Sequence, residues 1–328
     1  MENSAQFEPY EPDVVCYHSP CNDGMMAATA CATKWPSARY MPVNYNEEVD
    51  PLDFKGMKVL TVDFCFQKRQ LESVLSECKG LVILDHHVTS QEILKRDGDA
   101  LGIEFMDESI TLDSLDDDAK CCYFDMNRSG AVLTRDWVFA DRTLPAELSV
   151  PDLMFALALS QDHDLWRLEM RDTNEFYWGL QLHTNGPIEL AAKFKQEGIT
   201  RQIIDAGRSI KEFIEIKAKM AVDEARPVTV RNRKDGHLYD AMAASVPTYM
   251  FSHVGGSLAR KSHSGLGMCW NWSRGVYYVG FRSYERYGIV AVDCSKLAES
   301  YGGGGHKKAA GCRMNAEELN AILSSQNR

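Results

Sequence analysis

Short apolar runs alternate with helical patterns in the first hundred residues, and this alternation constrains the fold more than any other feature of the sequence. Residues 14–17, 58–62 and 81–84 form mostly apolar runs, and the Ala-rich segment 23–35 and the amphipathic segment 68–78 lie between them. Apolar strands that alternate with helices are typical of a parallel sheet covered on both faces. We therefore predict an α/β fold with a parallel sheet in the N-terminal half.

Polar residues stand where these predicted strands end. His18 follows the first run, Asp63 follows the second, and Asp85-His86-His87 ends the third. Open parallel sheets bind their ligands at the carboxyl ends of the strands. This coincidence in three strands predicts a functional site at one edge of the sheet.

The rest of the chain divides into a helical part and a second α/β part. Residues 129–225 have helical patterns, with Ser129 as a predicted N-cap, and Pro227 stops the periodic segment 200–225. Strand patterns follow at 228–230, 266–270, 276–281 and 289–292, and a helical pattern at 315–325. We predict a first domain over residues 1–199, a connecting helix over 200–226, and a smaller α/β domain over 227–328.

The charge of the chain limits its partners. With 36 basic and 47 acidic residues the net charge is −11, which disfavours long nucleic acids, because Lys and Arg contacts with phosphates supply much of that affinity. A short anion can still bind in a local pocket, particularly where metal ions offset the charge. The sequence shows no secretory segment and no apolar run long enough for a bilayer, and its ten cysteines are scattered. We expect a cytoplasmic protein without membrane association.

Imidazoles and carboxylates recur at the predicted strand ends and beyond them. The candidate metal ligands are His18, Asp23, Asp63, His86 and Asp162. Such ligands suit Mn²⁺ or Mg²⁺ better than a structural zinc ion, and two ions about 3.5–4 Å apart can activate water for attack on a phosphoester. Each residue taken alone has a simpler interpretation as a cap or a satisfied polar group, and His163 and Asp164 are alternatives to Asp162.

A glycine cluster near the C-terminus predicts an anion site. Residues 302–305 are four glycines, followed by His306. Glycines let the backbone approach a ligand closely, and successive N–H groups can bind an anion; a flexible linker is the alternative. Arg282 ends a predicted strand and can grip a phosphate with two N–H groups, or else pair with Glu285.

The order of these motifs resembles the DHH/DHHA1 phosphoesterase family, which includes RecJ-like nucleases, nanoRNases and cyclic-dinucleotide phosphodiesterases. Asp85-His86-His87 is similar to the motif that names the family, and Gly303-Gly304-Gly305-His306 is similar to the glycine signature of the DHHA1 domain. The further matches are His18 with Asp23, Asp63, Ser129-Gly130-Ala131, and Asp162.

The resemblance implies a role for each matched residue. His18 and Asp63 would hold one ion, and Asp23, Asp63, His86 and Asp162 would hold a second, with Asp63 as the bridge. Asp85 would orient the imidazole of His86, and His87 would face the phosphate. The first domain would then be catalytic, and the second would bind the substrate's nucleotide end through His306, Arg282 and the glycines.

One position departs from the family pattern. Many members have a second aspartate in the first motif, where this chain has Cys21. Cys21 is either a small packed side chain, which is the simpler interpretation, or a soft metal ligand.

Together these features predict a Mn²⁺-dependent phosphodiesterase, with Mg²⁺ as a possible substitute. Its substrates would be short RNA or DNA oligonucleotides or linear dinucleotides, cleaved to mononucleotides by metal-activated water. Cleavage from 3′ to 5′ is implied by the resemblance alone. The alternatives are a phosphatase for polyphosphate, 3′-phosphoadenosine 5′-phosphate or cyclic nucleotides, and a nucleotide-binding sensor with little catalysis. Both a monomer and a homodimer fit the sequence.

Overall fold

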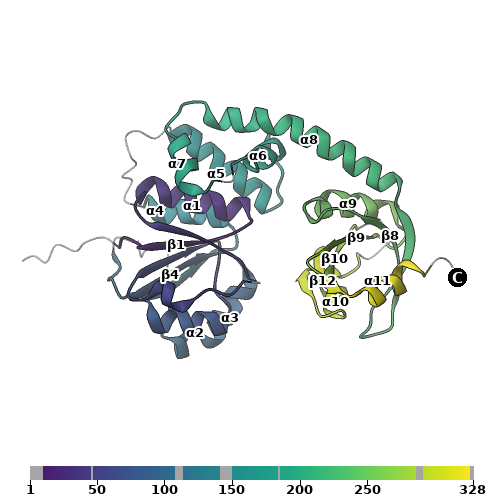
Figure 1. The fold of residues 1–328 in the computed structure, drawn as a ribbon, viewed down its shortest axis with the longest axis horizontal. Helices are drawn as coiled ribbons and strands as arrows, with labels where there is room; N and C mark the ends of the chain where they lie inside the picture. Colours follow the sequence, from purple (N-terminus) through teal and green to yellow (C-terminus); the bar gives the residue numbers. More distant parts are fainter. Residues whose placement is uncertain are drawn as a thin grey trace, which may run out of the picture. The chain divides into compact units, whose positions relative to one another are not determined.

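The protein is described here from a computed structural model, which covers residues 10–45, 47–107, 114–140, 150–183, 185–285 and 291–325. The chain forms two compact units, Met1–Lys211 and Glu212–Arg328 (Figure 1). Among the described helices, none combines the length and the apolar composition that a bilayer span requires.

The first unit contains a six-stranded sheet in which all neighbouring strands are parallel. Its strand order is β2-β1-β3-β4-β6-β5. The strands are β1 (Val14–His18), β2 (Arg39–Val43), β3 (Lys58–Val62), β4 (Gly80–Asp85), β5 (Glu104–Phe105) and β6 (Lys120–Phe124). The three predicted strands are β1, β3 and β4, which lie side by side. The predicted parallel-sheet α/β fold is confirmed.

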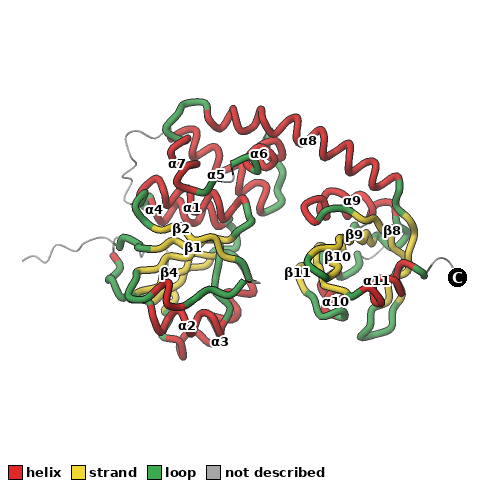
Figure 2. The backbone as a smooth tube through the Cα atoms, in the orientation of Figure 1, coloured by secondary structure: helices red, strands yellow, loops and turns green. Residues whose placement is uncertain are grey.

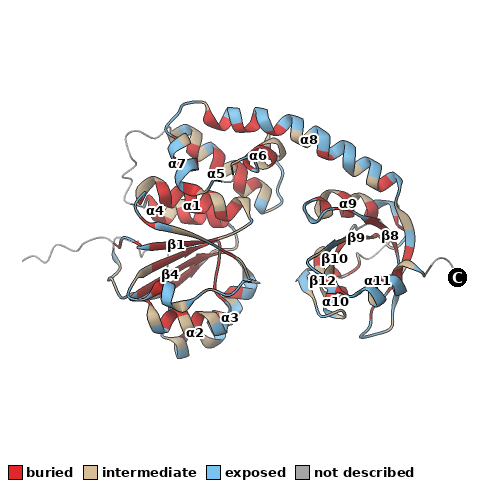
Figure 3. Ribbon diagram, viewed as in Figure 1, coloured by how far each residue is buried: buried red, intermediate tan, exposed pale blue. Residues whose placement is uncertain are grey.

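Helices cover both faces of this sheet (Figure 2). One face packs against α1 (Asn22–Lys34) and α4 (Gly130–Val138), and the other against α2 (Lys68–Glu77) and α3 (Val88–Leu101). Successive residues of a strand point to opposite faces, so Leu84 joins the first core while its neighbour Ile83 joins the second. The central strands β1, β3 and β4 are therefore buried on both sides (Figure 3), which explains their mostly apolar sequences.

Four further helices follow in the first unit and beyond it: α5 (Val150–Asp164), α6 (Thr173–Leu180), α7 (Pro187–Lys193) and α8 (Ile199–Asp223). A short 3-10 helix, η1 (Pro51–Phe54), precedes β3. Ser129 is the N-cap of α4, as predicted, because its hydroxyl accepts a hydrogen bond from the backbone N–H of Val132. The division between the two compact units falls within α8. The domain roles assigned to 1–199 and 227–328 stay predictions.

The second unit contains a mixed six-stranded sheet with the order β11-β12-β10-β9-β8-β7. Its elements are β7 (Arg226–Arg231), β8 (Leu238–Ser245), η3 (Thr248–Met250), α9 (Phe251–Lys261), β9 (Leu266–Ser273), β10 (Val276–Ser283), α10 (Cys294–Glu299), β11 (Gly304–His306), β12 (Ala309–Met314) and α11 (Ala316–Leu323). Only β8 and β9 pair in parallel among these described strands. Of the strand predicted at 289–292, residues 289 and 290 lie outside the described residues, and residues 291 and 292 are not in a strand.

Candidate metal centre

Three neighbouring strands bring their polar ends together. His18 is the last residue of β1, Asp63 follows β3 directly, and Asp85 is the last residue of β4. Asp63 has a φ of 54°, a left-handed conformation that Asp and Asn adopt more readily than most residues. Its backbone N–H donates to Leu84 O at 3.0 Å, which fixes this turn against β4.

Carboxylates surround the imidazole of His86. Its Nε2 atom lies 3.1 Å from Asp63 Oδ1, 3.5 Å from Asp164 Oδ2 and 4.0 Å from Asp23 Oδ2. The other oxygen of Asp63, Oδ2, lies 3.6 Å from His18 Nδ1. Asp63 therefore presents one oxygen to each of two ligand groups, which is the arrangement that its predicted bridging role requires.

Asp85 contacts His87 rather than the imidazole of His86. Its Oδ1 atom lies 2.6 Å from His87 Nδ1 and accepts hydrogen bonds from the backbone N–H groups of His86 and His87. The expected orientation of the His86 ring by Asp85 is thus wrong, because the chain turns after β4 and directs that ring toward Asp63. Burial lowers the pKa of His87, but the Asp85 contact outweighs it, so the pKa is raised overall.

Asp162 lies outside the cluster, although the sequence favoured it as a ligand. Its carboxylate accepts hydrogen bonds from the backbone N–H groups of Glu169 and Met170 and from the Thr173 hydroxyl. Two of these donors belong to the connection between α5 and α6 and the third is the first residue of α6, so Asp162 ties the connection and the start of α6 to the end of α5. Asp164, the alternative two residues further on, faces His86 instead, and we replace Asp162 by Asp164 as the candidate ligand.

The carboxylates of the cluster repel one another. The pKa of Asp23 is raised, first by burial and then by the charges of Asp164 and Asp63. Burial, followed by the charge of Asp63, raises the pKa of Asp164 to about 6. Burial raises the pKa of Asp63 as well, but contacts with His18 and His86 outweigh it, and that pKa is lowered overall.

The residues of the cluster fit a divalent cation. Three acidic groups converge on one imidazole, and a cation would offset their repulsion. The Nδ1 atom of His18 is buried and makes no hydrogen bond to another described residue, as expected of a nitrogen that binds a metal ion. Three overlapping groups have ligand atoms within 4.8 Å of one another: His18–Cys21–Asp63, Asp63–His86–His87 and Asp23–His86–Asp164.

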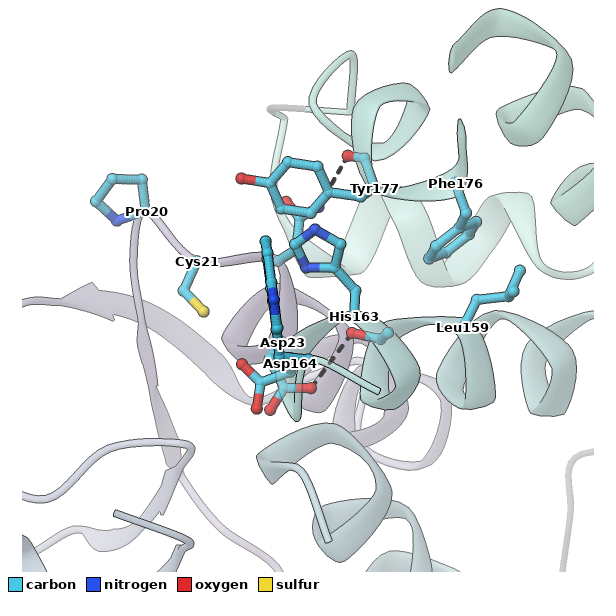
Figure 4. A pocket seen from close by; sticks show the side chains of 11 residues that line it. Pro20, Cys21, Asp23, Leu159, His163, Asp164, Phe176 and Tyr177 are labelled. Carbon is cyan, nitrogen blue, oxygen red and sulfur yellow. Dashed lines mark hydrogen bonds between the residues drawn. The ribbon is translucent and has the colours of Figure 1, made fainter. Parts of the chain in front are cut away.

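An aromatic pocket of about 250 Å³ adjoins the cluster (Figure 4). Asp23 and Asp164 of the cluster line it, together with the aromatic rings of His163, Trp166 and Tyr177. The rings of His163 and Tyr177 are stacked, with centroids 3.8 Å apart and planes at 10°. Trp166 is 56% exposed. Tyr177 is not among the site residues predicted from the sequence, because it comes from a different helix, α6.

In the second unit, Gly303 and Gly305 are needed for the close packing against β12, whereas Gly304 has open space around it. A side chain at Gly303 would meet Gly311 O at 2.1 Å, and Gly305 has a φ of 137°. Strand β11, which contains Gly304, Gly305 and His306, pairs with β12 and leaves His306 exposed. A phosphate contact by Gly303, Gly304, Gly305 and His306 therefore stays a prediction.

Arg282 is held inside the second unit. Its guanidinium donates to Phe281 O and to the hydroxyl of Ser252 on α9, and burial lowers its pKa. No ion pair joins it to Glu285, although the structure describes both residues. The alternative of an ion pair is thus not seen, and the phosphate contact stays a prediction.

Comparison with known proteins gave distant similarities. No protein-family model matches the chain. An uncharacterized protein of Acanthamoeba polyphaga mimivirus is 25% identical over 329 residues, which cover 93% of this chain and 68% of that protein.

Among solved structures, a pGpG-specific phosphodiesterase from Vibrio cholerae aligns with a TM-score of 0.46 and 11% identity, over 96% of this chain and 97% of that one. An exopolyphosphatase-related protein from Bacteroides fragilis aligns with a TM-score of 0.49 and 12% identity, over 96% of this chain and 91% of that one. An uncharacterized protein from Helicobacter pylori aligns with a TM-score of 0.41 and 11% identity, over 95% and 98% of the two chains. These likenesses are too low to support an argument about function.

Proposed function

We propose that the protein is a metal-dependent phosphodiesterase that hydrolyses short oligonucleotides or linear dinucleotides to mononucleotides. The observation that carries this proposal is the direct contact between a carboxylate–imidazole cluster and an aromatic pocket. Asp23 and Asp164 belong to both. A substrate can thus place a phosphoester at the cluster while an aromatic group enters the pocket.

The side chains of the carboxylate–imidazole cluster would have different roles in the reaction. Bound divalent cations lower the pKa of water and offset the charge of a phosphate. Asp63 holds the two ligand groups together, and Asp23 is fixed by hydrogen bonds from the backbone N–H of Ala131 and the hydroxyl of Ser160. His87, whose raised pKa favours the charged imidazolium, would donate a hydrogen bond to a phosphate oxygen. Its ring lies 4.6 Å from that of His86, centroid to centroid.

The pocket favours a nucleotide over polyphosphate. Nucleobases stack on aromatic side chains with about 1–3 kcal/mol per base, whereas a bare phosphate chain gains nothing from such rings. Trp166 exposes 56% of its surface and lies edge-on to His163, with ring centroids 5.6 Å apart. The net charge of −11 supports a short substrate, since long strands need many basic contacts.

The proposal is tested by measuring turnover of an RNA dinucleotide, a long single-stranded RNA and inorganic polyphosphate, with Mn²⁺, Mg²⁺ or a chelator. We expect rapid cleavage of the dinucleotide that requires a divalent ion, and slow cleavage of the long strand. Phosphate release from polyphosphate alone would contradict the proposal and favour a phosphatase. Tight dinucleotide binding without cleavage would also contradict it and favour a sensor.

Asp63→Asn is the matched inactive variant, because Asn also tolerates the left-handed conformation at this position. We expect at least about a 100-fold loss of turnover, since metal ions contribute several kcal/mol to transition-state stabilisation. The metal-free variant should still unfold cooperatively but be somewhat less stable than the metal-free parent, because contacts with His18 and His86 outweigh burial and lower the pKa of Asp63, and its ionised form therefore stabilises the fold. Retained turnover in a folded Asp63→Asn protein would remove the bridging role.

A further inference from the structure

The sulfur atom of Cys21 contacts the carboxylate–imidazole cluster of the candidate metal centre. Its Sγ atom is 3.5 Å from Asp63 Oδ2, the same oxygen that lies 3.6 Å from His18 Nδ1. The three ligand atoms are within 4.8 Å of one another. The other nine cysteines are buried.

The local backbone directs Cys21 toward the cluster. Cys21 is the N-cap residue of α1, with φ −148° and ψ 133°, and its side chain does not cap the helix. Figure 4 shows its sulfur on the side of the pocket where the carboxylates of Asp23 and Asp164 lie. Packing as a small apolar side chain does not account for this position, because the sulfur is in hydrogen-bond contact with a carboxylate oxygen of Asp63.

The distances match those between ligands of a single ion. Protein ligands bind zinc-like ions at about 2.3 Å through sulfur and about 2.0–2.1 Å through nitrogen or oxygen, in a tetrahedral arrangement. Neighbouring ligand atoms then lie about 3.5–3.6 Å apart for a sulfur–oxygen pair and about 3.3–3.4 Å apart for a nitrogen–oxygen pair. The 3.5 Å between Cys21 Sγ and Asp63 Oδ2 matches the first spacing, and the 3.6 Å between His18 Nδ1 and Asp63 Oδ2 is slightly longer than the second. The buried Nδ1 atom of His18, which makes no hydrogen bond among the described residues, supplies a second observation that points to a ligand here.

We propose that Cys21 binds metal as a thiolate, so that His18, Cys21 and Asp63 form a site for a thiophilic divalent ion such as Zn²⁺, Co²⁺ or Fe²⁺. Thiolates select softer metals, whereas carboxylates suit Mn²⁺ and Mg²⁺. The second group, Asp23, Asp63, His86 and Asp164, keeps the preference for harder ions. The centre would thus hold two different metals joined by Asp63. This inference rests on the metal centre of the proposed function and is independent of the substrate.

The test uses the full-length, reduced and metal-free protein, titrated with Co²⁺ in the absence of oxygen. Cobalt bound to a thiolate gives a charge-transfer absorption band in the near ultraviolet, which imidazole and carboxylate ligands do not give. We expect this band in the parent and its loss in Cys21→Ser and Cys21→Asp. Cys78→Ser is the matched control, because Cys78 ends α2 and its thiol is buried outside the cluster, and the band should remain.

Competition binding gives the second readout. Loss of the thiolate should weaken Zn²⁺ binding at least about tenfold, since even residues that only support a metal ligand have effects of about 10–100-fold. Compared with the parent, Cys21→Asp should bind Mn²⁺ more tightly relative to Zn²⁺, because a carboxylate suits the harder ion. Cys21→Ser should not show this gain in Mn²⁺ affinity.

Two results overturn the inference, and they differ in meaning. If Co²⁺ binds the parent without the charge-transfer band, and Cys21→Ser binds Zn²⁺ equally well, Cys21 is no ligand and the metal centre of the proposed function survives. If the parent binds neither Co²⁺ nor Mn²⁺, the inference and the proposed function fail together.

Discussion

Asp162 and Asp164 lie two residues apart on α5, and a helix turns by about 100° per residue, so their side chains leave it on nearly opposite faces. On one face, the carboxylate of Asp162 accepts three hydrogen bonds, from the connection to α6 and from the first residue of α6. The other face meets His86. The same residue type therefore has a structural role at one position and a candidate ligand role at the other.

Substitution of these two residues should separate the roles. Asp162→Ala should lower the free energy of unfolding by about 1–3 kcal/mol, because it leaves buried donors without an acceptor, and should change metal affinity little. Asp164→Asn should weaken divalent-ion binding at least about tenfold without lowering the stability of the metal-free protein, because it removes repulsion from Asp63. Chemical denaturation and metal titration measure both effects. Metal binding lost in Asp162→Ala but kept in Asp164→Asn would reverse the assignment.

At the scale of elements, α4 presses directly on the turn after β3. A side chain at Gly130, the first residue of α4, would meet Asp63 Cβ at 2.5 Å and Asp63 Oδ1 at 2.8 Å. The absence of a side chain there lets the start of the helix pack against the candidate bridging carboxylate. The position of Asp63 thus depends on two elements, β3 and α4, that are distant in sequence.

Gly130→Ala should displace Asp63 and reduce turnover and metal affinity at least about tenfold. The overpacking should also cost about 1–3 kcal/mol of stability. Gly98→Ala on α3 is the control, since its nearest contact, to Ile103 O, would be an ordinary 3.5 Å, and replacing this helical glycine should be neutral or slightly stabilising. Equal activity in the two folded variants would show that the close packing at Gly130 does not position Asp63.

The connection between β6 and α4 carries an ion-pair network. Asp125 accepts hydrogen bonds from the backbone N–H of Asn127 and from Arg128, which also pairs with Asp136 on α4. Burial raises the pKa of Asp125, but these contacts outweigh it and lower the pKa below its ordinary value of 3.8. The ionised form of Asp125 therefore stabilises the folded state.

Because the folded pKa is depressed, this contribution is present above about pH 4 and is lost as the pH falls through the folded value. Asp125→Asn should lower the free energy of unfolding by about 1 kcal/mol at pH 7. The difference between parent and variant should shrink as the pH falls below 3.8. Denaturation curves at pH 7 and pH 3 measure it, and a difference that grows in acid would contradict the assignment.

At the scale of the whole molecule, the two units have separate hydrophobic cores. Two clusters pack on the faces of the first sheet, and a third, which includes Leu266 and Phe281, fills the second unit. The candidate metal ligands all come from the first unit. Metal binding should therefore stabilise one unit selectively.

Scanning calorimetry should show two transitions, of which only one moves with metal. At an ion concentration 100 times the dissociation constant, the first unit should gain about 2.7 kcal/mol, and a chelator should reverse the gain. Leu266→Ala removes a fully buried side chain from the second core and should lower only the other transition, by about 2–5 kcal/mol in stability. One transition that responds to both changes would show that the units unfold together.

The sequence by itself determined the central strands of the first sheet and the edge of that sheet at which the candidate site lies. Continuous apolar runs specified β1, β3 and β4, because strands buried on both faces need apolar residues at every position. His18 and Asp63 at the ends of β1 and β3 followed from that assignment, since parallel strands end at one edge. Ser129 predicted the start of α4, because serine is a preferred N-cap residue whose hydroxyl accepts a hydrogen bond from the first turn of the helix.

Only the tertiary structure decided which side chains meet. Asp164 rather than Asp162, and His87 rather than His86 as the partner of Asp85, depend on how α5 and the turn after β4 are rotated against the sheet. The contact between Cys21 and Asp63 and the stacking of His163 on Tyr177 join residues that are 42 and 14 positions apart. Local sequence sets the period of a helix or strand, but packing against distant elements sets its rotation about its axis. That rotation decides which side chains face the candidate metal centre.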